Sequence, residues 1–269
     1  MSDPILQPCL MDPPWRLPGG TRLPGISPIA PDDWLRVDDA YAGQMALRDA
    51  LLRDHTEAVY RIVPEAEEAA QELLAMVLEW VGQQAGYQVT PDHVTRPDGV
   101  QVPLDRNNPL LTAGRLVQED LCLHLQQGDE HVLCGAVLCF PASWSLDEKI
   151  GKPLTRIHKP VPQYQGTLAT RVQRLFDAIR VGQPLVRANC LTYVDPSLHQ
   201  PRRENARRVQ PGLAADYVRT ERQCLLRLAQ TRAVVFSIHT TVVERATLSP
   251  EDDAAMVAYL AHHKAGALP

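Results

Sequence analysis

The stretch AVVFSIHTTV, residues 233–242, constrains the fold more than any other part of the chain. Val234, Phe236 and Ile238 alternate with positions that include Ser237, and this two-residue period is that of a β-strand. An apolar face alternating with a more polar one is typical of a half-buried strand in an antiparallel sheet. The sequence therefore predicts such a sheet and requires other segments to cover it.

Segments of both kinds surround this strand. Strands are expected at 130–140, 185–194, 218–228 and 233–243. Apolar residues at helical spacing predict helices at 65–83 and 167–180, and a further helix is expected at 39–54. Ser249-Pro250-Glu251-Asp252 is a start signal for a terminal helix over 249–264. Residues 116–125 fit a strand or a helix equally. Because helices and strands do not alternate as βαβ units, we expect the α+β class, with an antiparallel sheet flanked by helices.

Prolines crowd the beginning of the chain, where eight of the 23 fall within the first 31 residues. Proline cannot donate a backbone hydrogen bond, so this density disfavours both helix and sheet. We expect a Pro-rich extended arm over residues 1–31 and a single domain over residues 32–269, whose N-terminal part is helical.

Composition and motifs exclude several classes of protein. With 45% apolar and 22% charged residues the chain has an ordinary globular composition, and its net charge of -5 does not suit general binding to nucleic acid. No GxGxxG, GxxxxGK[ST], GxSxG or HExxH motif is present, and the six cysteines form no CxxC pair. No segment reads as a membrane span or a secretory signal, so we expect a cytoplasmic protein.

Residues 145–164, SLDEKIGKPLTRIHKPVPQY, contain the most constrained histidine. Ser145 and Glu148 have the spacing of a capping box, and Gly151 ends the short helical turn that they begin. His158 ends a second turn, and the two prolines that follow it stiffen the chain. A histidine on such a corner either caps a helix or is presented to a ligand, and the spacing leaves both interpretations open.

The strand expected at 218–228 carries charged residues that must face opposite ways. If Arg219, Glu221 and Gln223 point to one face of the sheet, Arg222 points to the other, together with the apolar residues further along the strand. Arg222 is then an inward-facing cation.

A buried guanidinium needs a carboxylate or an anionic ligand. Glu119 and Asp120, in the segment VQEDL, are the expected partners of Arg222. The arrangement is either an internal salt bridge or part of a ligand site, and the residues alone do not decide between them.

Several of these motifs together resemble a known family. They are VQEDLCL (117–123), FPASWSLDEKIGKPLTRIHKPVPQY (140–164), the R-x-N at 187–189, DPSLHQP (195–201), VRTERQCLLRL (218–228) and AVVFSIHTTV (233–242). The chain resembles, from about residue 28 to its end, the α-subunit family of haem-dependent oxidative N-demethylases. The stretch 144–164 is the most specific part of the resemblance.

The resemblance implies a PAS-like fold in which an antiparallel sheet, flanked by helices, holds haem b. It also implies a monooxygenase that oxidises a small secondary amine such as dimethylamine with O₂. The electrons are expected to come from NADPH through partner subunits that carry flavin and an iron–sulfur centre, because this chain has neither a nucleotide fingerprint nor a set of iron–sulfur cysteines.

The resemblance also suggests roles for single residues. His158 is expected to be the iron ligand, and Arg222 to donate hydrogen bonds on the oxygen side, with Asn189 and Tyr164 as further residues of the same wall. Because an alkylammonium must lose a proton before oxidation, a carboxylate is expected near the iron, supplied by Glu221 or Glu119. The haem propionates require cations, and the candidates are Lys152, Arg156 and Lys159.

Two positions depart from the family pattern. Cys190 stands where an aromatic residue, usually tryptophan, follows R-x-N, and His239 stands where the family has arginine. A missing aromatic residue opens a pocket and a histidine changes its charge, so the substrate need not be dimethylamine.

Two other readings of the same residues remain. The first is a PAS-like sensor that binds haem, a gas or a small molecule without turnover. The second is a haem-free interaction subunit in which His158 is only a helix cap. Cofactor content separates the second reading from the others, and turnover separates a sensor from an enzyme.

Overall fold

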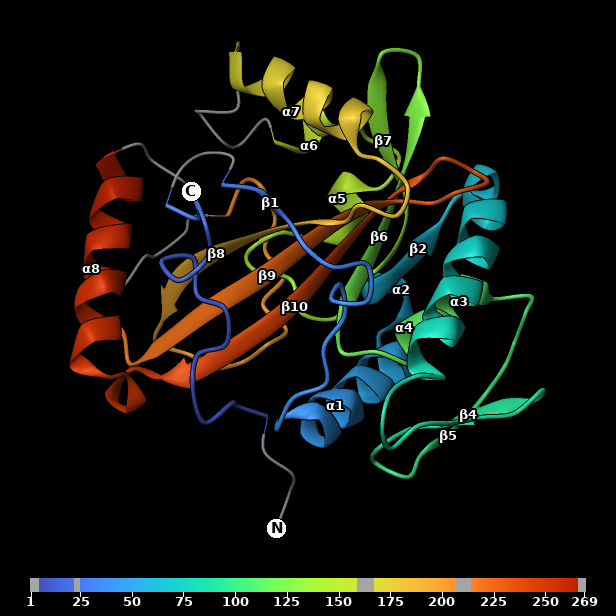
Figure 1. The fold of residues 1–269 in the computed structure, drawn as a ribbon, viewed down its shortest axis with the longest axis horizontal. Helices are drawn as coiled ribbons and strands as arrows, with labels where there is room; N and C mark the ends of the chain where they lie inside the picture. The colour runs from blue at the N-terminus through green and yellow to red at the C-terminus, as the bar shows by residue number, and fades with distance from the viewer. Residues whose placement is uncertain (1–4, 22–24, 159–166, 207–213, 266–269) are drawn as a thin grey trace.

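The structure is a computed structural model, and it describes residues 5–21, 25–158, 167–206 and 214–265. Its centre is a twisted antiparallel sheet with helices around it (Figure 1). The α+β class expected from the order of the segments is confirmed.

The sheet has the strand order β1-β8-β9-β10-β6-β7-β2, and every neighbouring pair is antiparallel. Its strands are β1 (Ser27–Pro28), β2 (Tyr60–Ile62), β6 (Asp120–Gln127), β7 (Glu130–Val137), β8 (Leu185–Tyr193), β9 (Tyr217–Arg227) and β10 (Val234–Glu244). A second, small sheet consists of β3 (Gln88–Val89), β4 (His93–Thr95) and β5 (Gln101–Pro103). The strands expected at 130–140, 185–194, 218–228 and 233–243 are thus confirmed, and the ambiguous segment 116–125 contributes to β6.

The described helices also follow the expected order. They are α1 (Tyr41–Asp54), α2 (Thr56–Val59), α3 (Glu67–Val81), α4 (Pro109–Gly114), α5 (Leu146–Lys149), α6 (Leu154–Ile157), α7 (Thr167–Ala178) and α8 (Pro250–Ala265), with 3₁₀ turns η1 (Pro64–Ala66) and η4 (Arg245–Thr247). α3 begins after Pro64 and carries glutamates in its first turn. Their negative charges interact favourably with the positive end of the helix dipole and stabilise the helix.

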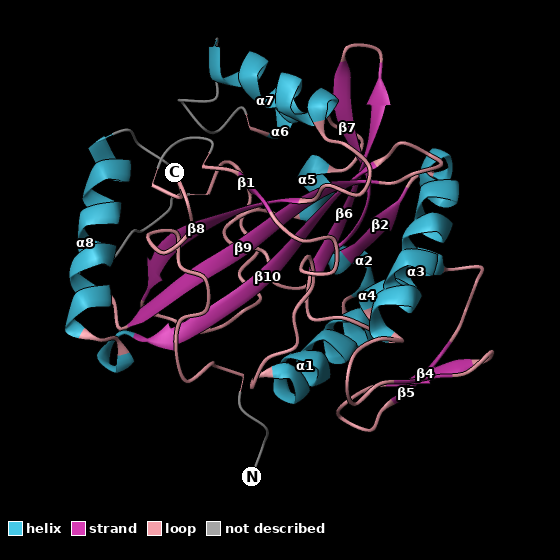
Figure 2. Ribbon diagram, in the orientation of Figure 1, coloured by secondary structure: helices cyan, strands magenta, loops and turns pink. Residues whose placement is uncertain are grey.

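Helices cover both faces of the sheet (Figure 2). Leu225 and Val234 pack under α6 and α7, and we call this side of the sheet the α6 face. Leu226 and Val235 lie in the large core with residues of α1, α3 and α4, and we call that side the α3 face. The expectation that β10 is half-buried is therefore wrong, because Ser237 on its more polar side is also buried.

The N-terminal segment lies against the sheet and α8. The backbone N–H of Gln7 donates to the carbonyl of Val242 at 3.0 Å, and the Val242 N–H donates to the Gln7 side chain at 2.9 Å. Leu10 packs in a small core with Met256 of α8. The division of the chain at residue 31 into an arm and a domain stays a prediction. No described helix is both long enough and apolar enough to cross a membrane.

Candidate functional site

His158 follows directly on α6, above the α6 face of the sheet. Its backbone N–H and its ring Nδ1 both lie within hydrogen-bonding distance of the Leu154 carbonyl, at 3.1 and 2.9 Å. Because a carbonyl only accepts, Nδ1 carries the proton and the lone pair of the neutral ring is on Nε2. Burial, together with the charges of Lys149 and Arg187, outweighs the hydrogen bond to Leu154 and lowers the pKa of His158 to about 4, so the ring is neutral at pH 7.

The segment before His158 is held in place on several sides. The hydroxyl of Ser145 donates to Glu148 at 3.0 Å, as the capping-box spacing predicts. Gly151 has a positive φ of 70°, a conformation that favours glycine, and it ends the turn of α5. The buried Lys149 donates to the carbonyl of Ile157 at 2.7 Å and forms an ion pair with Glu204. These contacts fix the corner on which His158 sits.

A carboxylate with three donors lies on the α6 face. Glu221 of β9 is 5% exposed and accepts from Arg219 at 3.1 Å, from Asn189 of β8 at 3.1 Å and from Gln223 at 3.0 Å. The expectation that Arg219, Glu221 and Gln223 share one face is confirmed by these bonds. Glu221 is consequently oriented before any ligand arrives.

Arg187 of β8 stands beside this carboxylate. Its Nη1 donates to the side-chain oxygen of Gln223 at 3.0 Å. Burial lowers the pKa of Arg187, and the neighbouring Tyr259 and Glu221 act in the opposite direction. Since the charge of Arg187 lowers the pKa of His158, the two side chains belong to one electrostatic environment. The α6 face thus brings together a neutral imidazole, an ordered carboxylate and a guanidinium.

The family model described as "Haem-dependent oxidative N-demethylase, alpha subunit-like" matches residues 25–265. The chain belongs to this family. The family name indicates a protein like the α subunit of a haem-dependent oxidative N-demethylase. An α subunit implies that other subunits exist.

Arg222, expected to serve the same family site, lies on the other side of the sheet. Its Nη2 is 3.1 Å from Asp33 and its Nε is 3.2 Å from Asp12, and its Nη1 donates to the thiol sulfur of Cys224 at 3.0 Å. Arg222 does face away from Glu221, as the alternation predicts. It therefore lies on the opposite face of the sheet from His158, and the role suggested for it beside a haem stays a prediction.

The expected partners of Arg222 are engaged elsewhere. Glu119 lies 3.0 Å from Nδ1 of His239 on the α3 face, and Asp120 forms a fully buried ion pair with Arg48 at 2.9 Å. Neither carboxylate neutralises Arg222, because Asp12 and Asp33 of the N-terminal segment do so instead. Glu119 lies on the side of the sheet away from His158, so the carboxylate of the two that shares a face with His158 is Glu221.

The cations suggested for the haem propionates differ in their surroundings. Arg156 donates to both oxygens of Glu204, at 3.0 and 3.1 Å, while Lys152 is exposed. Lys159 and Tyr164 lie outside the described residues.

The two positions expected to depart from the family pattern, Cys190 and His239, lie on the α3 face. Cys190 is buried in the small core with Val218 and Met256, and His239 is bonded to Asp38 and Glu119 at 3.0 Å each. Neither residue faces His158. Both residues therefore lie apart from the polar cluster of the α6 face.

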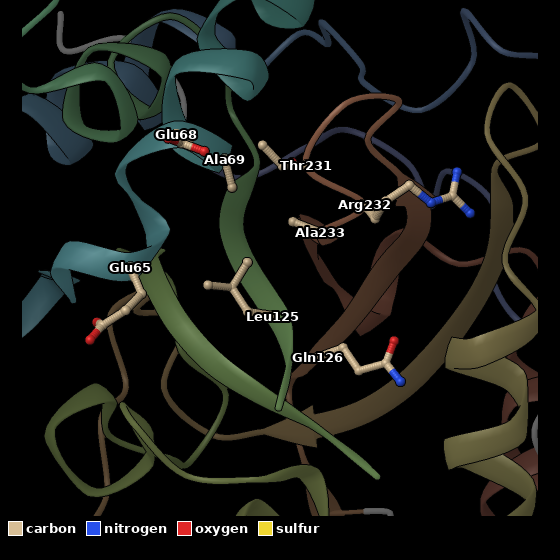
Figure 3. A pocket seen from close by; sticks show the side chains of 8 residues that line it. All are labelled: Glu65, Glu68, Ala69, Leu125, Gln126, Thr231, Arg232 and Ala233. Carbon is tan, nitrogen blue, oxygen red and sulfur yellow. The ribbon is translucent and has the colours of Figure 1, made fainter. Parts of the chain in front are cut away.

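Two surface hollows of the described residues lie away from this cluster. One has a volume of about 280 Å³ and is shown in Figure 3. Its lining residues come from η1, the start of α3, the end of β6 and the turn before β10: Glu65, Glu68, Ala69, Leu125, Gln126, Thr231, Arg232 and Ala233. The other hollow is next to Trp80 and the segment 30–37. Neither is lined by His158 or Glu221.

The described residues contain no group of three or more His, Cys, Asp or Glu side chains that could hold a bare metal ion. A haem, by contrast, needs only one axial side chain from the protein. The single imidazole of His158 suits the second case.

Proposed function

We propose that this chain is the haem-binding subunit of an oxidative N-demethylase, a monooxygenase that acts on a small secondary amine. The observation that carries the proposal is the hydrogen bond from Nδ1 of His158 to the Leu154 carbonyl, within a chain that belongs to this family. This bond fixes the tautomer and ring orientation in the way that metal-binding histidines require. The neutral state of His158 at pH 7 supports the same role.

The apolar side chains around His158 also suit a haem, whose ring system is largely apolar. Leu154 and Ile157 of α6, and Phe236 and Ile238 of β10, supply apolar surface beside the polar cluster. A histidine on a helix that packs over an antiparallel sheet supports the PAS-like reading of the fold. His158 would hold a haem b, and the haem would supply the O₂-dependent oxidising chemistry.

The amine is proposed to bind at Glu221. An alkylammonium is a cation, and a carboxylate is the group that pairs with it and accepts its proton. Arg219 and Asn189 hold the carboxylate in one orientation, so no reorganisation is needed when the amine arrives. Among the two carboxylates suggested by the sequence, Glu221 is favoured because it lies on the same side of the sheet as His158.

The remaining partners follow from the chemistry. We propose that electrons come from NADPH through a partner subunit with flavin and an iron–sulfur centre, and that Lys152, Lys159 and Arg156 lie at the mouth of the haem pocket. Tyr164 is proposed to line the same haem pocket. The amine oxidised is a small one of the dimethylamine type.

The test is the visible absorption spectrum of the full chain after haem is added, for the wild type and for His158→Ala. A Soret band that shifts on reduction with dithionite and again with carbon monoxide, and that is lost or displaced in the variant, is expected. His199→Ala is the matched control, because its ring also bonds a backbone carbonyl, that of Cys139 at 2.8 Å, outside the cluster. A wild-type chain that takes up no haem contradicts the proposal.

A further inference from the structure

Arg187 has one edge of its guanidinium without an acceptor. Its Nη1 donates to Gln223, whereas no described residue accepts a hydrogen bond from its Nε, which is buried, or from its Nη2. The Nε and Nη2 groups lie on the same edge of the planar guanidinium and carry parallel N–H bonds. That edge is the one that binds both oxygens of a carboxylate at once.

Arg187 is partly buried, whereas five arginines of the described residues are buried, and each of these has its charge or its donors satisfied within the protein. Four of them form ion pairs with carboxylates, which are Arg48 with Asp120, Arg96 with Asp49 and Asp98, Arg219 with Glu221, and Arg222 with Asp33. Arg227 donates to the carbonyls of Ile179, Arg232 and Phe176. Arg187, in contrast, has a single amide oxygen and no described carboxylate within 4.0 Å.

Gln223 keeps Arg187 in this state. Its amide nitrogen donates to Glu221 at 3.0 Å, which turns its oxygen toward Arg187. The amide therefore stands between the guanidinium and the carboxylate and prevents them from pairing directly. Arg219 already neutralises Glu221, so the cluster of these three charged groups carries one uncompensated positive charge. Desolvation makes such a charge costly unless an anion joins it.

We propose that Arg187 binds a carboxylate group of a bound molecule through its Nε and Nη2 edge. The proposal rests on the haem function given above, because the two sources of such a carboxylate at this place are a haem propionate and an acidic group on the amine substrate. A substrate of the second kind is an N-methylated amino acid, whose ammonium binds Glu221 while its carboxylate binds Arg187.

The first arm of the test measures the affinity of the full chain for haem and for haem dimethyl ester, in which both propionates are uncharged. If Arg187 holds a propionate, the wild type binds haem about 10-fold or more tightly than the ester, as expected for a charge-assisted bond, and Arg187→Gln loses this preference. Ester discrimination reports on the charge and not on general folding. Arg180→Gln, at an exposed arginine, is the matched control and keeps the wild-type ratio.

The second arm compares N-methylglycine with dimethylamine by calorimetric binding. If Arg187 holds a substrate carboxylate, the wild type prefers N-methylglycine by about 10-fold or more and Arg187→Gln abolishes the preference. A wild type with no haem uptake sinks the haem function while this arm still tests Arg187 on the haem-free chain. If Arg187→Gln does not fold, Arg187→Lys, which keeps the charge but loses the fork, is expected to reduce the preference in part.

Equal ratios in the wild type and Arg187→Gln for both pairs of ligands overturn the proposal. If Arg187→Gln changes only the ratio of affinities for haem and its dimethyl ester, Arg187 binds a haem propionate. If it changes only the ratio for N-methylglycine and dimethylamine, Arg187 binds the carboxylate of the substrate.

Discussion

The charged histidine on the α3 face makes a prediction for stability that the distances allow to be worked out. His239 is 2% exposed, with Nε2 at 3.0 Å from Asp38 and Nδ1 at 3.0 Å from Glu119. Burial lowers the pKa of His239, but the hydrogen bonds and charges of the two carboxylates outweigh it and raise the pKa to about 9. Both ring nitrogens then donate, so the ring is an imidazolium at pH 7.

The sign of the effect follows from linkage. Because the folded pKa lies above the ordinary value of 6.5, the stabilisation is complete below pH 6.5 and is lost as the pH rises through about 9. At about 1.4 kcal/mol per pKa unit, the contribution is on the order of 3 kcal/mol. Asp38 stays ionised throughout, since burial, which raises its pKa, is outweighed by bonds from His239, Gln118 and Gln7, and the pKa is about 2.

The measurement is the free energy of unfolding in urea for the wild type and for His239→Gln at several pH values between 6 and 10. The difference between the two proteins is expected to be about 3 kcal/mol at pH 6 and to approach zero near pH 10. Taking the difference removes the titration of tyrosines and cysteines, which both proteins share. His55→Gln, at an exposed histidine, is the control and shows no such trend. A difference that stays constant from pH 6 to 10 refutes the reasoning.

Three further predictions concern single sites. Asp120→Asn leaves the charge of the fully buried Arg48 unpaired and is expected to cost about 3–5 kcal/mol in urea unfolding, unlike Asp54→Asn in an exposed pair. Gly114→Ala places a methyl group 2.6 Å from a side-chain carbon of Val137, and overpacking of about 1–3 kcal/mol should lower the melting temperature; an unchanged value contradicts the close contact. Glu221→Gln removes the proposed anchor of the amine, so KM for dimethylamine should rise about 10-fold or more with the haem spectrum unchanged, whereas an unchanged KM assigns the amine to another group.

The sequence predicted the elements of the fold better than the contacts between them. The period of the strands is local, so alternation was enough to place Glu221 and Arg222 on opposite faces. Which carboxylate neutralises Arg222 depends on a chain segment that lies 189 residues away in the sequence, at Asp33. Sequence distance carries no information on such a contact, and the nearer candidates in VQEDL turned out to be used by other cations.

Part of the candidate site was readable and part was not. Arg187 and Asn189 are two residues apart on β8, so strand alternation places both on one face of the sheet. This spacing is the sequence signal that points to Arg187 as a further residue of the site. The role of Gln223 could not be found in this way, since it depends on a bond to Arg187 on the neighbouring strand. An amide between two charged groups has no signature in a single sequence.

The sheet separates two groups of charged residues that differ in purpose. On the α3 face, His239 and Arg222 are each paired with carboxylates from the N-terminal half of the chain, so their charges hold the N-terminal segment to the sheet. On the α6 face, Glu221 and Arg187 keep an amide between them and one guanidinium edge remains open. A charge that stabilises the fold is paired with an opposite charge inside the protein, whereas a charge that binds a ligand must keep hydrogen-bonding groups available for that ligand. His239 belongs to the first group, so a change at this position alters how the chain is held together and lies on the other face of the sheet from His158.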